Sequence, residues 1–293
     1  MGIYKRMGAK RCRVPVMALM LAVAFSAPLW AREGVEVGER STFADLVGAE
    51  QVEQQAKLQY QQTLKAAAQQ RALAPADNAQ LRRLREIAQK IIPLAGEWNE
   101  RARQWNWEVN LIGSNQINAF CMPGGKIVFY TGILKNLQLT DDEVAMVMGH
   151  EIAHALREHA RERVGKSTIT SGAARLGGAL LSGWLGIPSS VMDIAAQQGA
   201  NLLTLKFGRE DESEADLVGM ELAARAGFDP RAGVSLWQKM SAANKGAPPQ
   251  WLSTHPSGNT RIAEIEANLP KVMPLYERAR QANAAQAPAN KAP

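Results

Sequence analysis

The chain has little of the two side chains that most often bind transition metals in proteins. It holds only four histidines and two cysteines in 293 residues. Cys12 precedes the apolar core of an N-terminal leader, so a processed protein would keep Cys121 alone. A single cysteine excludes an internal disulfide, and no cysteine follows Cys12 in the leader to accept a lipid. Cys121 is most simply interpreted as a small buried hydrophobe.

Acidic residues are missing from the first 31 positions, where all five charged residues are basic (Lys5, Arg6, Lys10, Arg11 and Arg13). Removing these five from the 34 lysines and arginines leaves 29 against 28 acidic residues, which lowers the net charge from +6 to +1. The body of the protein is therefore nearly neutral. This balance argues against nucleic acid as a partner.

Residues 1–31 have the pattern of a secretory signal peptide, with a basic start and an apolar stretch from Val14 to Trp30. Pro15, Ser26 and Pro28 interrupt the stretch, which favours removal after Ala31 over a permanent anchor. We therefore expect a periplasmic location, with peripheral association with a membrane as an addition to it.

A second uncharged stretch runs from Leu176 to Met192, but glycines, serines and Pro188 dilute its hydrophobicity. It falls short of the roughly 20 apolar residues of a membrane-spanning helix. We expect residues 166–208 to form a mobile cover over the site described next, or a surface that contacts hydrophobic substrates.

Two of the four histidines stand in the pentapeptide His150-Glu151-Ile152-Ala153-His154. On a helix, positions i and i+4 lie on one face with their Cβ atoms about 6 Å apart. Both imidazoles can then bind one Zn²⁺ ion at about 2.0–2.1 Å. Glu151 is placed to accept a proton from water at the metal. The pattern predicts a zinc site with hydrolytic chemistry.

The sequence around the pentapeptide predicts a long amphipathic helix. Thr140 and Glu143 fit a capping box, apolar residues recur at helical spacing after them, and the far end to residue 163 is polar. His159 would then lie about 140° further round this helix than His154. We therefore expect His159 on the surface and outside the metal site.

The remaining patterns predict further helices and a small sheet. We expect one long helix over residues 41–72 capped by Ser41, a second from Asp77 or Asn78 to Pro93, and a third begun by Asp229-Pro230. Strands are expected at residues 105–112, 116–122 and 126–131. The predicted fold class is α+β and mostly helical, with the small sheet beside the pentapeptide helix.

These elements suggest a division of the chain. The expected parts are a signal peptide (1–31), an N-terminal helical segment (32–74), a metallopeptidase domain (75–270) and a largely disordered C-terminal tail (271–293).

A third zinc ligand is sought in Glu210-Asp211-Glu212-Ser213-Glu214-Ala215-Asp216, where five of seven residues are acidic. Such a run is often a solvated helix face. However, Glu212 and Asp216 share one face at i and i+4. One carboxylate there can bind zinc while the other accepts the free N–H of a ligand imidazole.

At this point the chain resembles the HtpX/BepA-like gluzincin zinc metallopeptidases, which belong with the CAAX prenyl protease type, and it looks like a periplasmic member. The stretches that carry the likeness are Asn118-Ala119-Phe120 with Pro123-Gly124-Gly125 and Thr131-Gly132, the His150 pentapeptide, Glu212 to Asp216, and Thr254-His255-Pro256-Ser257 with Arg261. The chain lacks the helical repeats of BepA-like members and clear membrane helices of HtpX-like ones.

The resemblance implies a zincin-like metallopeptidase domain. It implies Glu212 as the third zinc ligand and Asp216 as the carboxylate behind a ligand imidazole, and it disfavours Glu210 and Glu214. It also implies that Asn118, Ala119 and Phe120 form an edge strand that binds extended substrate.

Two residues keep alternatives open. His255 can donate to the oxyanion of the reaction, occupy the open position of the zinc in a self-inhibited form, or only cap a local turn. Arg261 can stabilise nearby negative charge or make an ion pair on a helix surface.

The sequence as a whole predicts a zinc-dependent endopeptidase of the bacterial cell envelope, with one Zn²⁺ per chain and Glu151 as general base. Unfolded or misassembled envelope proteins are the substrates that the resemblance implies. The alternative is a non-catalytic periplasmic chaperone or assembly factor that retains a zinc site. The native substrate and the oligomeric state stay open.

Overall fold

The computed structural model describes residues 1–2, 32–169, 202–243, 249–256 and 259–286. The predicted signal peptide and most of the predicted cover over residues 166–208 lie outside the described residues. From Glu33 onward the chain forms one unit by its internal contacts.

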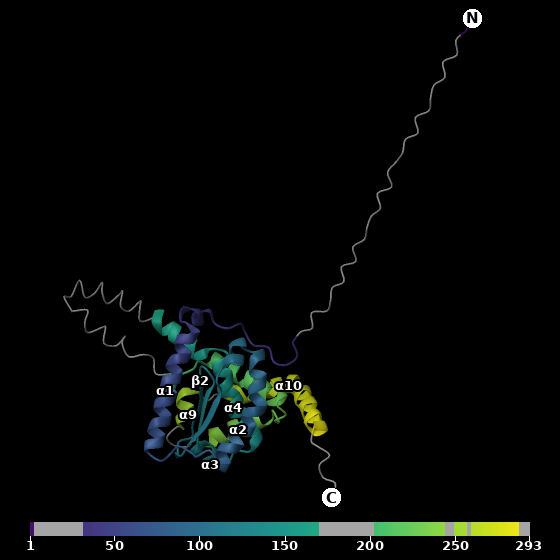
Figure 1. Ribbon diagram of the computed structural model, residues 1–293. Coiled ribbons are helices and arrows are strands. Elements are labelled where there is room, and N and C mark those ends of the chain that lie inside the picture. Colours follow the sequence, from purple (N-terminus) through teal and green to yellow (C-terminus); the bar gives the residue numbers. More distant parts are fainter. Residues whose placement is uncertain (3–31, 170–201, 244–248, 257–258, 287–293) are drawn as a thin grey trace, which may run out of the picture. The chain divides into compact units, whose positions relative to one another are not determined.

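A three-stranded sheet lies next to the pentapeptide helix (Figure 1). Its strands are β1 (Glu108–Ile112), β2 (Ala119–Met122) and β3 (Lys126–Tyr130), in the order β1-β3-β2. β3 pairs in parallel with β1 and antiparallel with β2. Gly124 and Gly125, at φ +83° and +76°, make the left-handed turn that joins β2 to β3. All three predicted strands are present, and β2 is an edge strand as expected.

The pentapeptide lies on α4 (Asp141–Leu156), which begins with the predicted capping box of Thr140 and Glu143. The predicted amphipathic helix to residue 163 was wrong in two respects. Every residue from Glu143 to Leu156 is buried, so the helix has no solvated face. The helix also ends at Leu156, because Glu158 adopts the left-handed conformation (φ +59°), and a new helical run occupies residues 159–169.

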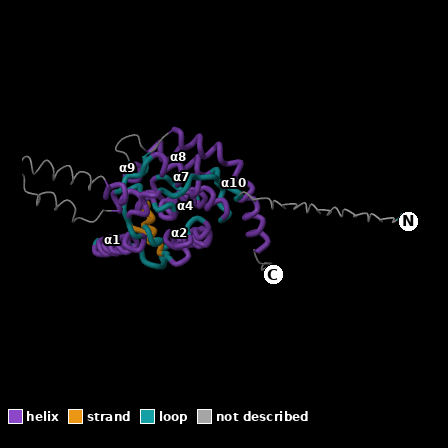
Figure 2. The backbone as a smooth tube through the Cα atoms, turned by 90° about the horizontal axis from the view of Figure 1, so that it is seen from above, coloured by secondary structure: helices purple, strands orange, loops and turns teal. Residues whose placement is uncertain are grey.

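The second central helix, α7 (Arg209–Arg225), crosses α4 at a pair of glycines. A Cβ atom added to Gly149 would lie 2.5 Å from the carbonyl oxygen of Gly219. A Cβ atom on Gly219 would lie 2.5 Å from the backbone nitrogen of His150. The two backbones therefore approach more closely than side chains would permit, and the acidic face of α7 comes within reach of the histidines of α4. Figure 2 shows both helices at the centre of the fold.

The N-terminal region differs from the predicted single helix over residues 41–72. A 3₁₀ helix, η1 (Thr42–Leu46), is followed by extended backbone at Val47 and Gly48 before α1 (Ala49–Gln69) begins. Ser41 makes no side-chain cap. α1 packs against β2 and β3. Gly48 explains the break, since glycine favours non-helical backbone.

The second predicted helix is confirmed as α2 (Ala79–Ile91), where the Asn78 side chain accepts from the backbone N–H groups of Gln80 and Leu81. The chain continues through η2 (Ile92–Glu97) and η3 (Glu100–Gln104) to the sheet, and α3 (Thr131–Asn136) connects β3 to α4.

The C-terminal part is helical. It comprises η4 (Leu202–Thr204), α7, α8 (Ala232–Ala243), α9 (Gln250–Thr254) and α10 (Asn259–Gln286). α8 begins two residues after Pro230, and the Asp229 side chain accepts from the Arg231 N–H. The prediction of a disordered tail from residue 271 was wrong up to Gln286, because Val272, Leu275 and Tyr276 bury their side chains in the core.

The described residues confirm the predicted class, mostly helical with a small sheet. None of the helices described here has both the length and the apolar character needed to cross a membrane.

Candidate metal centre

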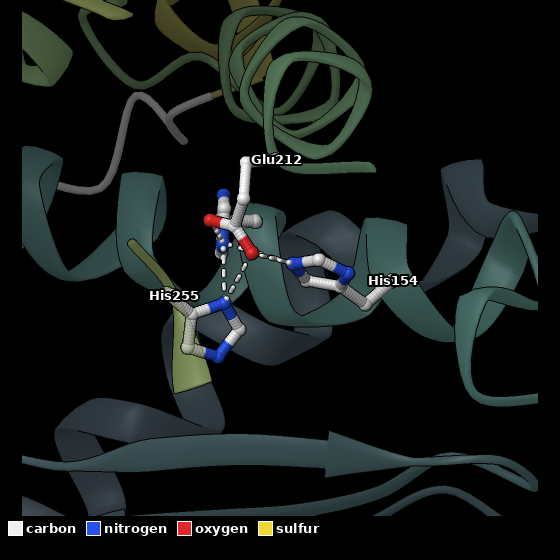
Figure 3. Close-up of side chains that lie close together, drawn as sticks. His154, Glu212 and His255 are labelled. Atoms are coloured by element: carbon white, nitrogen blue, oxygen red, sulfur yellow. Dashed lines mark hydrogen bonds and ion pairs between the residues drawn. The ribbon is translucent and has the colours of Figure 1, made fainter. Parts of the chain in front are cut away.

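Three helices bring together four side chains that can bind a metal (Figure 3). His150 and His154 come from α4, Glu212 from the first turn of α7, and His255 from the residue that follows α9. One ligand atom from each lies within 4.8 Å of the others, and all four residues are buried. We call these four residues the metal-site group.

The spacing of these atoms fits a zinc ion. The Nε2 atoms of His150 and His154 are 3.0 Å apart, Glu212 Oε2 lies 3.6 Å from His150 Nε2, and Glu212 Oε1 lies 3.5 Å from His154 Nε2. A tetrahedral zinc with bonds of about 2.0–2.1 Å separates its ligand atoms by about 3.3–3.4 Å. The three distances lie on either side of that value. Two imidazoles and a carboxylate are also the donor set of a catalytic zinc site.

His255 lies inside the same group and not only at a local turn. Its Nδ1 atom is 3.0 Å from Glu212 Oε1 and 3.2 Å from His150 Nε2. Its Nε2 atom is 3.6 Å from Glu151 Oε1. Burial lowers the pKa of His255, but the nearby carboxylates of Glu151 and Glu212 outweigh burial and raise it overall. The ring thus has access both to the metal position and to Glu151.

A buried ion network supports His150 and Glu212 from behind. His150 Nδ1 lies 3.0 Å from Asp216 Oδ1. Arg261 donates to both oxygens of Asp216 at 2.6 and 2.7 Å and to Glu212 Oε2 at 2.6 Å. Its guanidinium also lies over the ring of Trp237, 3.7 Å from the centroid. Arg261 is only 4% exposed, so the surface ion pair considered from the sequence was wrong.

The network keeps both carboxylates charged. Burial raises the pKa of Asp216, but the charge of Arg261 opposes burial and, with the hydrogen bonds to Asp216, brings the pKa down to about 2. Burial likewise raises the pKa of Glu212, and the hydrogen bond with His255 contributes most to the net lowering. Two ionised carboxylates at this place favour a cation between the imidazoles.

Glu151 has a partner that the sequence analysis missed. The indole N–H of Trp251 donates to Glu151 Oε1 over 2.6 Å, and both residues are buried. Trp251 also stacks on His255, with ring centroids 5.0 Å apart. Trp251 precedes His255 by four residues, the spacing of one helix face, which was the available signal in the sequence.

An aromatic ring covers one face of His154. Phe207 stacks on its ring at a centroid distance of 4.1 Å. Burial and the neighbouring His150 lower the pKa of His154 well below its usual value, so the imidazole is neutral. A neutral imidazole is the form that binds a metal.

The prediction that His159 lies on the surface was wrong, since only 2% of the residue is exposed. Its Nδ1 atom lies 2.8 Å from His154 Nδ1, and its Nε2 atom lies 2.7 Å from Glu214 Oε2. The prediction assumed one continuous helix, whereas the left-handed Glu158 redirects the chain and returns His159 towards His154. His159 and Glu214 lie outside the metal-site group, and Glu210 is exposed.

A cavity lies beside the metal-site group and along β2. Its lining includes the predicted Asn118, Ala119 and Phe120, together with Cys121, Glu151, His154 and His255. The sequence analysis missed Leu205 and Phe207 as apolar lining residues, because they belong to no motif. Cys121 is half-buried at this cavity rather than fully buried, and burial raises the pKa of its thiol.

Among the described residues, β2 pairs with a strand on one side only, so alternate backbone groups of β2 have no strand partner. The Tyr130 N–H donates to the Asn118 carbonyl, and β2 then pairs antiparallel with β3. Hydrogen-bonded and non-bonded pairs alternate along such a ladder. Asn118 and Phe120 therefore pair inward with β3, and the backbone groups of Ala119 and Cys121 point away from it.

Comparison with known proteins gives the family. The family model described as Peptidase family M48 matches residues 78–269. The mitochondrial metalloendopeptidase OMA1 of Arabidopsis thaliana is 40% identical over 162 residues, covering 53% of this chain and 30% of its own length. OMA1 of Bos taurus is 34% identical over 189 residues, covering 59% of this chain and 34% of its own.

The Beta-barrel assembly-enhancing protease of Escherichia coli is 30% identical over 174 residues, covering 56% of this chain and 35% of its own length. The chain thus spans about a third of each of these three relatives. The residues matched by the family model include all of the metal-site group, and the match agrees with the family resemblance noted from the sequence. On this basis the chain belongs to peptidase family M48.

Proposed function

We propose that the protein is a zinc-dependent endopeptidase. The observation that carries the proposal is a carboxylate outside the zinc-binding set, Glu151, that borders both the metal-site group and the cavity along β2. A structural zinc site has no need of such a group beside an open cavity. The membership of family M48 supports the same conclusion.

His150 and His154 would hold Zn²⁺ through their Nε2 atoms, and Glu212 would hold it through its carboxylate. When bound, the zinc ion supplies a Lewis acid that makes water acidic and polarises a carbonyl. Asp216 lies at the Nδ1 atom of His150, and Arg261 donates to Oε2 of Glu212, so both contacts hold the ligand side chains in place.

Glu151 acts as general base and then as general acid. Its carboxylate accepts the proton of the attacking water and returns it to the leaving amine. The hydrogen bond from Trp251 fixes one carboxylate oxygen, Oε1. The other oxygen, Oε2, is left to exchange the proton.

The substrate lies along β2 as an added strand. The outward backbone groups of Ala119 and Cys121 pair with the peptide, and the apolar walls at Phe120, Leu205 and Phe207 accept its side chains. Backbone pairing of this kind gives affinity with modest sequence preference. Backbone pairing with β2 requires the substrate to be an extended chain, so we propose unfolded proteins as the substrates.

His255 has two proposed roles, and its position supports the self-inhibited one. Its Nδ1 atom lies 3.0 Å from Glu212 Oε1 and 3.2 Å from His150 Nε2, so the ring would supply a fourth donor atom to a bound zinc ion. When substrate displaces the ring, the imidazole is free to donate to the oxyanion. A His255→Ala variant separates these roles, because higher activity supports self-inhibition and loss of activity supports catalysis.

We further propose that the enzyme acts in the bacterial cell envelope, where it cleaves misfolded or misassembled proteins. The signal-like pattern of residues 1–31 supports this location, and so does the similarity to the Beta-barrel assembly-enhancing protease of E. coli. The OMA1 relatives are named as mitochondrial proteins. Release of a tagged full chain by osmotic shock of a Gram-negative host tests the proposal, and retention with cytoplasmic markers overturns it.

The test of the activity is the Glu151→Gln variant, assayed on unfolded casein with Glu86→Gln as control. Glu86 carries the same charge on an exposed position of α2. We expect Glu151→Gln to bind one zinc per chain and to lose cleavage by a factor on the order of 10³. Glu86→Gln should match the wild type. Undiminished cleavage by pure Glu151→Gln protein would overturn the assignment.

A second function has one observation in its favour. His255 makes a fourth protein residue in the metal-site group, and four protein ligands are typical of a closed, structural zinc site. A non-catalytic chaperone that keeps such a site is therefore the competing proposal. Assistance of refolding by Glu151→Gln protein, together with a wild type that cleaves nothing, would favour it.

A further inference from the structure

His159 and Glu214 form a buried chain behind the second zinc histidine. His154 Nδ1 lies 2.8 Å from His159 Nδ1, and His159 Nε2 lies 2.7 Å from Glu214 Oε2. Arg157 closes the chain with an ion pair to Glu214 Oε1 at 2.6 Å. The side chains of His154 and His159 are 3% and 2% exposed, so water has little access to the hydrogen bond between the rings.

Only one arrangement of protons satisfies this chain and leaves His154 able to bind zinc. Its Nε2 atom faces His150 and Glu212 and must carry a lone pair for the metal. The proton of a neutral His154 is then on Nδ1, where it is donated to His159 Nδ1. His159 must accept at Nδ1 and carry its own proton on Nε2, and the carboxylate of Glu214 accepts that proton.

We propose that His159 is a positioning residue that, held by Glu214, fixes the tautomer and ring orientation of His154 for zinc. This inference rests on the proposed role of His154 as a ligand. Carboxylates or carbonyls commonly accept the free N–H of a zinc histidine, and here an imidazole stands between the ligand and the carboxylate. His159 itself belongs neither to the metal-site group nor to the residues that line the cavity.

The left-handed residue Glu158 is what makes this contact possible. A continuous helix would place His159 about 140° round the axis from His154. Because α4 ends at Leu156 and a new helical run begins at residue 159, the two rings come face to edge with centroids 4.9 Å apart. The break in the helix therefore has a direct consequence for the metal site.

The test measures zinc affinity of the full chain by competition with a chelating dye at neutral pH. His159→Phe keeps an aromatic ring at this position and removes both ring nitrogens. We expect its zinc dissociation constant to rise about 10–100-fold, the usual cost of losing such a partner. His159→Asn can still accept at the place of Nδ1, so we expect it to restore most of the affinity. Glu214→Gln should weaken binding less than His159→Phe does.

Glu210→Gln is the matched control, since it makes the same change one turn earlier on α7 at an exposed position. It should bind zinc as the wild type does. Equal affinity of wild type, His159→Phe and Glu214→Gln would overturn the inference. If His159→Phe fails to fold, Glu214→Gln and the spectroscopic measurement below decide.

Nitrogen-15 NMR of histidines in the zinc-free protein gives an independent readout. We expect His154 protonated on Nδ1 and His159 protonated on Nε2, and we expect Glu214→Gln to populate the opposite tautomers. The opposite tautomers in the wild type would contradict the inference. A wild type that binds no zinc, or a His154→Ala variant that binds as tightly as wild type, instead overturns the proposed function itself.

Discussion

The metal-site group and the substrate edge along β2 are adjacent, yet they are built in opposite ways. In the metal-site group and the ion network behind it, charged side chains are buried and each has a charged or hydrogen-bonded partner, as with Arg261 between Asp216 and Glu212. At the edge, Asn118, Phe120 and Cys121 are partly exposed, the cavity lining is mostly apolar, and alternate backbone groups of β2 have no strand partner among the described residues.

The difference separates two tasks. A site that stabilises charge in a reaction must be organised before the substrate arrives, because reorganising buried dipoles costs energy. Recognition of many unfolded chains requires the reverse, a surface with few specific polar contacts. We therefore expect substitutions in the metal-site network to change stability and zinc binding, and substitutions at the edge to change the KM alone.

The largest effect is expected from Arg261→Met, which leaves two buried carboxylates without their cation. Loss of one partner of a buried ion pair typically costs about 3–5 kcal/mol. We expect a decrease of that size in the free energy of unfolding of the zinc-free protein, measured by urea denaturation. Arg278→Met removes an exposed ion pair with Glu33 and serves as control, with a loss of at most about 1 kcal/mol. An equal loss of unfolding free energy in Arg261→Met and Arg278→Met would contradict the view that the buried network stabilises the protein more than an exposed ion pair does.

The second prediction concerns the crossing of α4 and α7. In Gly219→Ala the added methyl group would meet the backbone of His150, so the helices must separate. Overpacking of this kind costs about 1–3 kcal/mol. Zinc affinity should fall together with the thermal midpoint, because the crossing holds Glu212 close to His150. Gly38→Ala adds a methyl group in open space and should change neither quantity.

The third prediction concerns the outward backbone N–H of Cys121 on β2. Cys121→Pro removes an outward backbone N–H, whereas Cys121→Ala changes the side chain and retains it. One peptide hydrogen bond is worth about 0.5–1.5 kcal/mol, so we expect Cys121→Pro to raise the KM roughly 2–10-fold relative to Cys121→Ala. Zinc content and kcat should stay unchanged. If the two variants have the same KM, the substrate does not pair with this part of β2.

The smallest effect is expected at Glu143, at the start of α4 and away from the metal. Burial raises the pKa of Glu143, but the hydrogen bond from Lys239 contributes most to a net lowering. A carboxyl with a lowered folded pKa stabilises the protein above its unfolded pKa of about 4.3. That stabilisation disappears as the pH falls through the lower folded pKa. Glu143→Gln should therefore cost about 0.5–1 kcal/mol near pH 7 and nothing at strongly acidic pH, without affecting zinc.

The sequence predicted the parts of the site that follow from local spacing. His150, His154 and the capping box at Thr140 required only helix geometry. Glu212 and Asp216 are also one helical turn apart, and the resemblance to a family indicated which carboxylate faces the metal. The edge position of β2 was predicted in the same way.

The sequence-based predictions were wrong or incomplete where the structure depends on a break in the backbone or on a contact between residues far apart in the sequence. Glu158 carries no glycine-like signal for its left-handed conformation, so the helix was extended and His159 was placed on the surface. Arg261 acquires its role only when α10 packs against α7, and Trp251 acquires its role only when its indole reaches Glu151 on α4. Phe207 stacks on His154 from a segment without a motif, and no periodicity in the sequence indicates that contact.

X-ray absorption at the zinc edge of the purified wild-type protein tests the central claim most directly. The claim is that imidazole nitrogens and a carboxylate, with no thiolate, bind one zinc per chain. We expect only nitrogen and oxygen neighbours at about 2.0–2.1 Å, with the multiple-scattering signature of at least two imidazoles. A sulfur neighbour at about 2.3 Å, which Cys121 alone could supply in the part of the chain that the structure describes, would contradict the account.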